Sequence, residues 1–404
     1  MTCPFCPLHC DDLDFDPVSG SAEGIRGDCQ RAMEALRQLE EFHADSQSAS
    51  AACDGEEFLA RCLAVPASAC VSEEPRWVIG GTILDLQTAR SAIRLAATHQ
   101  GSIDLHSSSS ARAFRAAWER QGYIGATLGE LRHRFDTVIL IGDCLQHWPR
   151  LRSLLQPPPL SRHPPLHRRI CHLLPTDDAV AKKARMADHN PAAETIFDYP
   201  PGRLHDTLAA LLSPRSGAPE LPLHPLRSWI DQGTSTAWLW APTSLDPLAA
   251  GILCELSRRE NEHRRMALIP LAEDQLFRHV SSWHCGLSGP LDFVPVIPRL
   301  DQQPTLPVPR LRLWLQPFPT APDAPRDAVP TLVLGAPRKE SLAPGSMWVR
   351  AAIPGVEVGG TAMRGDGGVS LPLRGSSAGQ VPATAAEILD LWAAALTARR
   401  LDRC

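Results

Sequence analysis

The sequence has little of several features that commonly reveal function. Its 404 residues include only three lysines (Lys182, Lys183 and Lys339) and two tyrosines, and arginine carries nearly all of its positive charge. With a net charge of -5 the chain cannot neutralise a nucleic-acid backbone. No run approaches the ~18 apolar residues that span a membrane, and Met1–Cys6 has no basic segment leading into an apolar core. We therefore expect a cytoplasmic protein that binds neither nucleic acid nor membrane.

Motifs for common enzyme chemistry are also missing. There is no G-x-G-x-x-G, Walker or H-E-x-x-H sequence, so Gly80–Gly81 is interpreted as a plain turn. Glu130 and Asp136 could form an acid/base pair, but a helix cap by Glu130 or its local pairing with Arg132 or Arg134 is the simpler expectation. His163, His167 and His172 lie among prolines and fit no helix face, which favours a solvated surface. We expect no catalytic residues in this chain.

Cysteine, in contrast, is abundant: there are 12, and in a reducing compartment they are interpreted as metal ligands or buried thiols before disulfides. Four of them, Cys3, Cys6, Cys10 and Cys29, have the spacing C-x2-C-x3-C-x18-C. Three thiols within eight residues and a distant fourth can surround one iron–sulfur cluster. Zinc is an alternative, although its structural sites more often consist of two C-x2-C pairs, and unliganded thiols are another. His9 borders the motif, and the other eight cysteines show no ligand spacing.

Strand and helix patterns alternate along the rest of the chain. The clearest strand, Thr137–Gly142, is apolar throughout, as a strand buried on both faces should be. Such alternation predicts βαβ units around a parallel sheet, hence an α/β fold. The expected divisions are a cysteine-cluster lobe and linker at 1–54, α/β domains at 55–175 and 176–345, and a C-terminal strand, Gly-rich loop and helix at 346–404.

Individual elements follow from the same patterns. The expected helices are Gln30–Phe42, Leu86–His99, Ala111–Gln121, Pro247–Arg259 and Ala383–Arg399. The other expected strands are Arg76–Gly80, Ser102–Leu105, Arg169–Leu174, Ala237–Ala241, Met266–Pro270, Leu311–Leu315, Thr331–Leu334 and Trp348–Ile353.

Several stretches, in order, resemble one family. Cys3–Leu13 (C-P-F-C-P-L-H-C-D-D-L) resembles the opening of the formylmethanofuran dehydrogenase B-subunit family, in the molybdopterin oxidoreductase superfamily. Thr127–Asp136, Ser282–Gly286 with Asp292-Phe293, and Pro354–Gly367 resemble later motifs of that family. The resemblance covers nearly the whole chain. It implies a molybdopterin-oxidoreductase-like fold and a [4Fe–4S] cluster on Cys3, Cys6, Cys10 and Cys29.

The departures from the family bear on function. Where the family has a metal-ligating cysteine before its T-L-G-E run, this chain has His106 followed by four serines, Ser107–Ser110. A serine can ligate molybdenum in some relatives, but a polar loop with a helix N-cap is the simpler expectation. His284-Cys285 and Met363 also replace family residues. We therefore expect no metal-pterin centre. Arg364 and Asp366 could bind an anion, but we expect the loop that carries them to have a structural role.

The resemblance fits best the B-type component of a formyltransferase/hydrolase complex, which releases formate from formyl-tetrahydromethanopterin. It implies a non-redox structural subunit, inactive alone, that assembles with an amidohydrolase-like A subunit, a C subunit and a formyltransferase subunit. The alternative is a redox-active formylmethanofuran dehydrogenase component with a [4Fe–4S] cluster and a tungsto- or molybdopterin. The apolar segments Trp238–Pro242 and Leu291–Pro298 are candidate contact surfaces, unless they belong to the core.

Overall fold

The computed structural model divides into two compact units. It describes residues 2–11, 29–45, 77–156, 158–159, 167–177, 194–212, 225–287, 290–293, 309, 311–338, 340, 342–375 and 382–401. Unit 1 combines Met1–His106 with Glu273–Cys404, and unit 2 is the continuous stretch Ser107–Ala272. Unit 2 is therefore an insertion in the sequence of unit 1.

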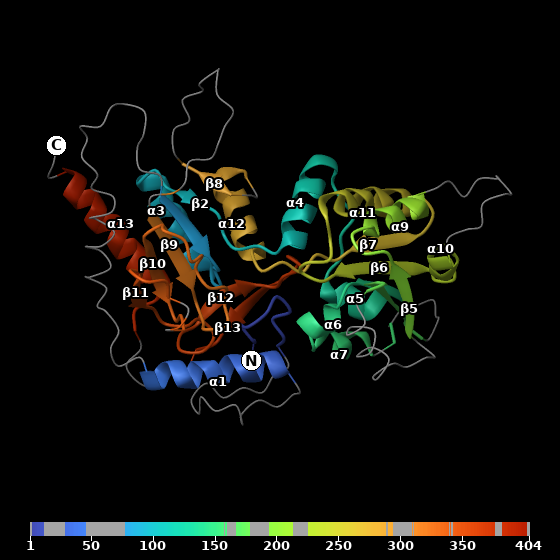
Figure 1. Cartoon of the computed structure of the whole chain (residues 1–404), viewed down its shortest axis with the longest axis horizontal. Helices are drawn as coiled ribbons and strands as arrows, with labels where there is room; N and C mark the ends of the chain where they lie inside the picture. The colour runs from blue at the N-terminus through green and yellow to red at the C-terminus, as the bar shows by residue number, and fades with distance from the viewer. Residues whose placement is uncertain are drawn as a thin grey trace, which may run out of the picture. The chain divides into compact units, whose positions relative to one another are not determined.

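Unit 1 is built on a six-stranded sheet (Figure 1). In spatial order its strands are β11 (Met347–Arg350), β10 (Thr331–Gly335), β9 (Leu311–Gln316), β1 (Trp77–Gly81), β2 (Ser102–Ile103) and β8 (Leu291–Asp292). All neighbours run parallel except β2 and β8. The chain extends the sheet from β1 toward β2, then returns to place β9, β10 and β11 on the other side. The strand order therefore reverses between β1 and β9.

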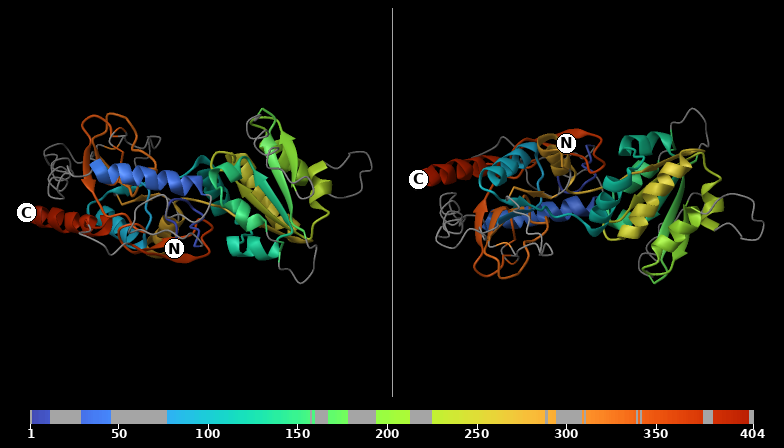
Figure 2. Two further views of the ribbon diagram at one scale, coloured as in Figure 1. Left: turned by 90° about the horizontal axis from the view of Figure 1, so that it is seen from below. Right: turned by 90° about the horizontal axis from the view of Figure 1, so that it is seen from above.

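Helices cover this sheet through apolar faces. The helices of unit 1 are α1 (Gln30–Asp45), α3 (Leu86–Thr98), α12 (Gln275–Cys285) and α13 (Ala385–Leu401), and β12 (Gly360–Met363) pairs antiparallel with β13 (Ser370–Leu373). α3 packs against α13 and α12, and its buried Ile93 and Leu95 join the core beneath the sheet. α1 lies on the side of the strands away from α3, as the view from below in Figure 2 shows.

Unit 2 has a five-stranded, all-parallel sheet with helices on both faces. Its order is β5 (Glu194–Tyr199), β4 (Arg169–Pro175), β3 (Thr137–Ile141), β6 (Ser235–Trp240) and β7 (Arg265–Leu268). Figure 1 shows α4 (Ser109–Gln121), α9 (Leu204–Leu212) and α11 (Pro247–Glu260) on one face, and α5 (Leu128–Arg134), α6 (Cys144–His147) and α7 (Leu151–Leu155) on the other; α10 (Pro225–Ile230) lies near one edge. Every residue of β3 is buried, as its apolar sequence predicts.

The α/β expectation is confirmed, but the units differ from the expected domains. β3 and β4, expected in the domain 55–175, pair in one sheet with β6 and β7. β1 pairs with β9, expected in the domain 176–345. Residues 175 and 345 therefore correspond to no boundary between sheets, because long-range strand pairing, which alternation along the sequence does not encode, decides which strands share a core.

One of the two proposed contact surfaces is wrong, and the other is described only in part. Trp238, Leu239, Trp240 and Ala241 are buried in or directly after β6, so Trp238–Pro242 is core, not a contact surface. Leu291 is buried in β8, and residues 294–298 lie outside the described residues. Within the described ranges, no helix is long and apolar enough to cross a membrane.

The predicted histidine surface is wrong for one residue. His172 is buried in β4, where its Nε2 lies 3.1 Å from Oε2 of Glu194 on β5. His167 is exposed, as expected, and His163 lies outside the described residues. His172 is paired because a strand side chain in a covered sheet must face either the core or a polar partner.

Candidate functional site

The N-terminal residues form a closed loop. The backbone N–H of Cys3 donates to the carbonyl of Cys10 at 2.8 Å, and that of His9 donates to the carbonyl of Cys6 at 3.1 Å. His9 has a φ of 42°, a left-handed conformation uncommon outside glycine. Its ring Nδ1 donates to the Cys3 carbonyl at 2.9 Å, which fixes the tautomer. Together these bonds hold three of the candidate cysteines in one short turn.

Contacts with the rest of unit 1 hold this loop in place. Phe5 meets Phe318 edge to face, with ring centroids 5.5 Å apart. Arg31 on α1 donates from Nε to the Phe5 carbonyl at 3.2 Å. The N–H of Gly365 donates to the carbonyl of Pro7 at 2.7 Å. α1, the segment after β9 and the loop between β12 and β13 therefore all position the cysteine segment.

The four candidate thiols share one neighbourhood. Cys29 stands directly before α1, and its carbonyl accepts the N–H of Met33. Cys3 and Cys29 are buried, whereas Cys6 and Cys10 are half-buried. Burial raises the pKa of Cys3 well above its usual value, and the charges of Cys6, Cys10 and Cys29 raise this pKa further. Cys3 and Cys29 belong to one apolar cluster of unit 1, and Cys10 packs against it.

The surroundings of Cys6 act on its thiol in opposite directions, and burial has the largest effect. Burial raises its pKa, but the Arg31 guanidinium and the backbone N–H groups of Leu8 and His9 act in the opposite direction. Hydrogen bonds from backbone amides to sulfur are also what stabilise iron–sulfur thiolates. The loop therefore supplies the backbone donors of a ligating turn.

The donor set matches a metal site in kind but not in arrangement. None of the four cysteines is in a disulfide, and thiolates suit iron–sulfur clusters or zinc. Among the residues with described positions, however, no group of three or more His, Cys, Asp or Glu side chains is arranged to hold a metal ion. We therefore derive no chemistry through a cluster; the assignment of one to these cysteines stays a prediction.

A buried polar pair borders the thiol loop. His9 is buried, and this burial lowers its pKa; the charges of Arg364 and Asp366 act on it in opposite directions. Arg364 and Asp366 form an ion pair at 2.8 Å, and the Asp366 side chain is fully buried. The loop that carries them bonds to Pro7 through Gly365. These contacts give the Gly-rich loop the structural role expected of it.

The serine run has the expected role of a helix cap in unit 2. Ser108 is the N-cap of α4, and its side chain accepts the N–H of Ala111 at 3.2 Å. The Ser110 hydroxyl donates to the Ala241 carbonyl and accepts the Leu245 N–H, both at 2.9 Å. Ser107 is buried, and its Oγ finds no hydrogen-bond partner within the described part of the chain.

Glu130 and Asp136 do not form an acid/base pair. Glu130 closes a capping box with Thr127 at the start of α5, and it pairs with Arg134, as predicted, and with Arg265. Asp136 is buried and accepts hydrogen bonds from the backbone N–H groups of Thr234 and Ser235. Both carboxylates are therefore used in holding the fold.

Other predicted features have structural explanations. Cys144, Cys171 and Cys254 are buried thiols and Cys285 is half-buried; Cys53, Cys62, Cys70 and Cys404 lie outside the described residues. Ser282–Gly286, compared above with a family loop, is the end of α12, which Gly286 terminates in a left-handed conformation. Trp283 on that helix has an exposed fraction of 71%.

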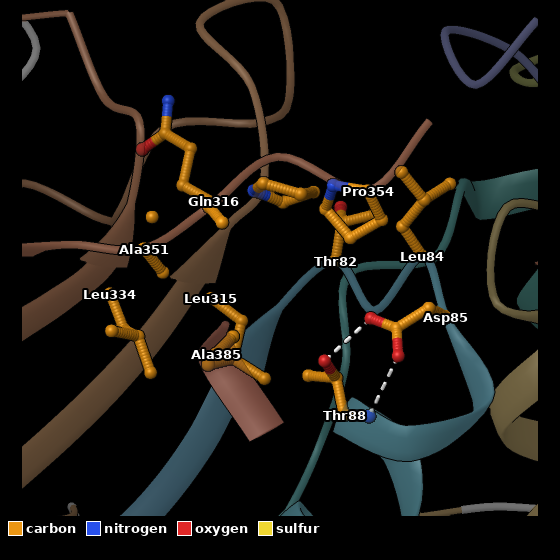
Figure 3. A pocket seen from close by; sticks show the side chains of 13 residues that line it. Thr82, Leu84, Asp85, Thr88, Leu315, Gln316, Leu334, Ala351, Pro354 and Ala385 are labelled. Atoms are coloured by element: carbon orange, nitrogen blue, oxygen red, sulfur yellow. Dashed lines mark hydrogen bonds between the residues drawn. The ribbon is translucent and has the colours of Figure 1, made fainter. Parts of the chain in front are cut away.

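One pocket was missed by sequence reasoning (Figure 3). It lies in unit 1 at the carboxyl ends of β1, β9 and β10, and includes about 290 Å³ of empty space, part of it open to solvent. Its polar wall is formed by Thr82, Asp85 and Thr88, with the Asp85 carboxylate bonded to Thr88. The one available signal was Asp85 standing before the predicted helix Leu86–His99, a typical N-cap.

Comparisons with known proteins relate the fold to one assembly. No protein-family model matches the chain, and neither does any curated protein. Among solved structures, the chain is similar to one from the formyltransferase/hydrolase complex (FhcABCD) from Methylorubrum extorquens in complex with methylofuran. The TM-score is 0.67 at 21% sequence identity, covering 88% of this chain and 98% of the other. At this identity the similarity establishes a related fold.

Proposed function

We propose that this chain is the B-type, non-redox structural component of a formyltransferase/hydrolase complex that releases formate from formyl-tetrahydromethanopterin. The observation that carries the proposal is the fold: almost the full length of a chain from such a complex, 98%, superposes on this one. The ordered motif resemblance between residues 3 and about 370 points to the same assembly. Neither argument alone identifies the component, but both lead to one candidate.

The roles of the key polar residues support a structural rather than a redox role. Where the family carries a ligand cysteine, Ser108 and Ser110 are engaged in capping and bracing α4. Glu130 and Asp136 are engaged in helix capping and strand contacts. A metal-pterin centre has no thiol to bind in this loop, and we propose that none is present.

The partners follow from the proposal: an amidohydrolase-like A subunit, a C subunit and a formyltransferase subunit, in the cytoplasm. The affinity-tagged chain, isolated from its native cells, should co-purify with all three. The purified chain alone should release no formate from formyl-tetrahydromethanopterin, whereas the assembled complex should. A monomer that hydrolyses or oxidises formylated substrates by itself would contradict the proposal.

A redox-active dehydrogenase component is the second candidate, favoured by one observation. Cys3 and Cys29 share one apolar cluster against which Cys10 packs, and Cys6 lies in the same short loop as Cys3 and Cys10; a purely structural component does not need such a set of thiols. Elemental analysis of anaerobically purified protein separates the candidates. Stoichiometric tungsten or molybdenum with bound pterin selects the redox enzyme. Iron and acid-labile sulfide alone, or zinc alone, leave a structural centre that pins the N-terminal loop to unit 1.

A further inference from the structure

We propose that Cys3 and Cys10 are an oxidisable pair, which a low-molecular-weight disulfide converts into an intrachain bridge that closes the N-terminal loop. The four cysteines near the N-terminus have the spacing of a metal site. Among the described residues, however, no group of His, Cys, Asp or Glu side chains is arranged to hold a metal ion, and none of the four cysteines is in a disulfide. This role for the pair does not depend on the proposed function.

The main chain brings Cys3 and Cys10 together. The N–H of Cys3 donates to the carbonyl of Cys10 at 2.8 Å, so these two residues meet where the loop closes. Residues joined by a main-chain hydrogen bond across antiparallel segments have Cα atoms roughly 5.5 Å apart. A disulfide spans Cα atoms about 4.4–6.8 Å apart, so this pair can be bridged without a large movement of the backbone.

The two side chains lie on the same side of the loop. Cys3 belongs to an apolar cluster of unit 1, and Cys10 packs against that cluster. Because both side chains contact one cluster, they do not point apart, which is the second geometric condition for a bridge. Cys29 also belongs to the cluster, but its main chain is engaged in the first turn of α1, where its carbonyl accepts the N–H of Met33. A bridge between Cys3 and Cys29 is therefore the rival outcome.

The loop is already held in the closed conformation that a bridge needs. His9, with its φ of 42°, turns the chain directly before Cys10. Its ring Nδ1 bonds to the Cys3 carbonyl at 2.9 Å, and its N–H donates to the Cys6 carbonyl at 3.1 Å. Two prolines, Pro4 and Pro7, further restrict the backbone. Bridging therefore costs little additional conformational entropy in the folded chain.

The surroundings suit a disulfide and allow a reagent to reach one of its sulfurs. Cys3 is only 8% exposed and lies among apolar side chains. A metal ligand must be a thiolate, and a buried thiolate without a metal has no compensating charge. A disulfide carries no charge, so it can be buried there without this penalty. Cys10 is half-buried, and it is therefore the thiol that a dissolved reagent meets first.

The reaction consists of two thiol–disulfide exchanges. The Cys10 thiolate attacks one sulfur of the small disulfide, and the other half leaves as a thiolate that takes up the proton that Cys10 released. Cys3 then loses its proton, attacks the Cys10 sulfur and expels the second small thiolate, which is protonated in turn. Two cysteine thiols lose two electrons in total, and one small disulfide gains them to give two thiols. The bridged loop has lost two of its four candidate metal ligands.

Oxidised glutathione is the probe, and it is applied to the full-length protein as purified. The remaining thiols are then alkylated in urea, and tryptic peptides are analysed by tandem mass spectrometry without reduction. The three cysteines of the loop lie in peptide 1–26, and Cys29 lies in peptide 27–31. We expect peptide 1–26 to lose two hydrogen atoms and to be alkylated only at Cys6. Full alkylation of this peptide, glutathione retained on Cys10, or a bridge between the two peptides would overturn the proposal.

A matched pair of variants identifies the partners. Cys10→Ser should abolish the bridge and leave Cys3 to be alkylated. Cys6→Ser removes a half-buried thiol of the same loop and should leave the bridge intact. Loss of the bridge in Cys6→Ser, or a bridge from Cys3 that persists in Cys10→Ser, would refute the pairing. Bound iron with sulfide, or zinc, that protects all four cysteines of the purified protein would refute it as well. None of these results bears on the proposed function, which is tested by co-purification and formate release.

Discussion

Arg168 shows how a single buried side chain ties several elements together. It is almost fully buried, and its guanidinium donates to the carbonyls of Leu131 and Arg132 in α5, Phe135 after it, and Leu154 and Leu155 in α7. A cation at two helix C-termini also meets the negative ends of both dipoles. Burial lowers the pKa of Arg168 to about 10, so the side chain is still charged at neutral pH.

Removing this guanidinium should be costly. In Arg168→Met the five carbonyls lose their donor in the interior, and we expect a loss of at least about 3 kcal/mol in the free energy of unfolding. Arg258→Met is the control, because Arg258 is exposed and its ion pair with Glu255 is a surface pair; it should change stability by about 0.5 kcal/mol or less. Urea unfolding of both variants measures the difference, and equal effects would contradict this role for Arg168.

Glu273 gives a prediction about pH. Its Oε2 is enclosed and makes no hydrogen bond within the described part of unit 1, and burial raises its pKa. The protonated form is therefore favoured in the folded state. Below pH 4.5, the Glu273 carboxyl is protonated in both the folded and the unfolded state. As the pH rises above 4.5, the unfolded state releases this proton first, so the free energy of unfolding decreases.

Glu273→Gln should consequently raise stability at pH 7, by about 1 kcal/mol, and the gain should vanish by about pH 4. Glu34→Gln is the opposite control, because Arg37 and Gln38 lower the pKa of exposed Glu34 to about 2. That substitution should bring no gain at pH 7. Thermal unfolding from pH 4 to pH 8 tests both; a gain for Glu273→Gln that does not depend on pH would point to a cause other than its charge.

At the scale of elements, Gly81 shows what the sequence pattern could not reveal. The pattern indicates a plain turn at Gly80–Gly81 that ends a strand, and β1 does end there. The structure adds the reason for glycine: φ is +91°, and a Cβ at residue 81 would lie 2.1 Å from the backbone oxygen of Leu315 on β9. The close approach of two strands far apart in sequence requires it.

Gly81→Ala should therefore be more damaging than an ordinary glycine replacement. Gly122 after α4 also has a positive φ of +73°, but a Cβ there would meet nothing within 4 Å. With ψ at 174°, Gly122 lies in a region nearly exclusive to glycine, and we expect Gly122→Ala to cost about 2 kcal/mol from backbone strain alone. Gly81→Ala adds a clash with main-chain atoms and should cost at least about 2 kcal/mol more. Similar costs measured by chemical denaturation would show that β1 and β9 can separate slightly without penalty.

Most regular elements were predictable because their signals are local. Leu86–His99, Pro247–Arg259 and Thr137–Gly142 appear within a residue or two of the predicted bounds, since each carries its own apolar periodicity. β5 was missed: it is an edge strand in which only Glu194 and Tyr199 are buried, so it lacks a continuous apolar run. α12 was missed although Leu276, Phe277 and Val280 have helical spacing, because a family loop motif was assigned to its end.

The two candidate sites also differ in whether their residues are close together in the sequence. The four cysteines were singled out because three of them lie within eight residues, and the metal site proposed for them stays a prediction, since no group of described His, Cys, Asp or Glu side chains is arranged to hold a metal ion. The pocket beside Asp85 could not be predicted from the sequence. Its wall combines β9, β10, the start of α13 and the loop after β1, and these segments are far apart in the sequence. Where strands pair across long sequence separations, the local pattern predicts the individual strands and helices but not which of them lie next to each other.

At the scale of the whole molecule, the nesting of the two units is the main departure from expectation. Unit 2 is continuous, and its hydrophobic core, which includes Leu208, Trp238 and Leu253, is drawn entirely from within Ser107–Ala272. Its five strands all belong to one sheet. A segment with its own closed set of strand partners and its own core meets the conditions for independent folding.

We therefore predict that the excised fragment 107–272 folds by itself. It should show a cooperative thermal transition and a dispersed NMR spectrum, because it loses no strand partner of its sheet. The matched control is fragment 176–345, cut at the domain boundaries expected from sequence. That fragment keeps β5, β6 and β7 without β3 and β4, and β9 and β10 without β1, so each sheet is divided and buried faces are exposed. It should aggregate or remain unfolded. A cooperative transition in the control, or its absence in 107–272, would show that the cores of the two units are not separable as the strand pairing indicates.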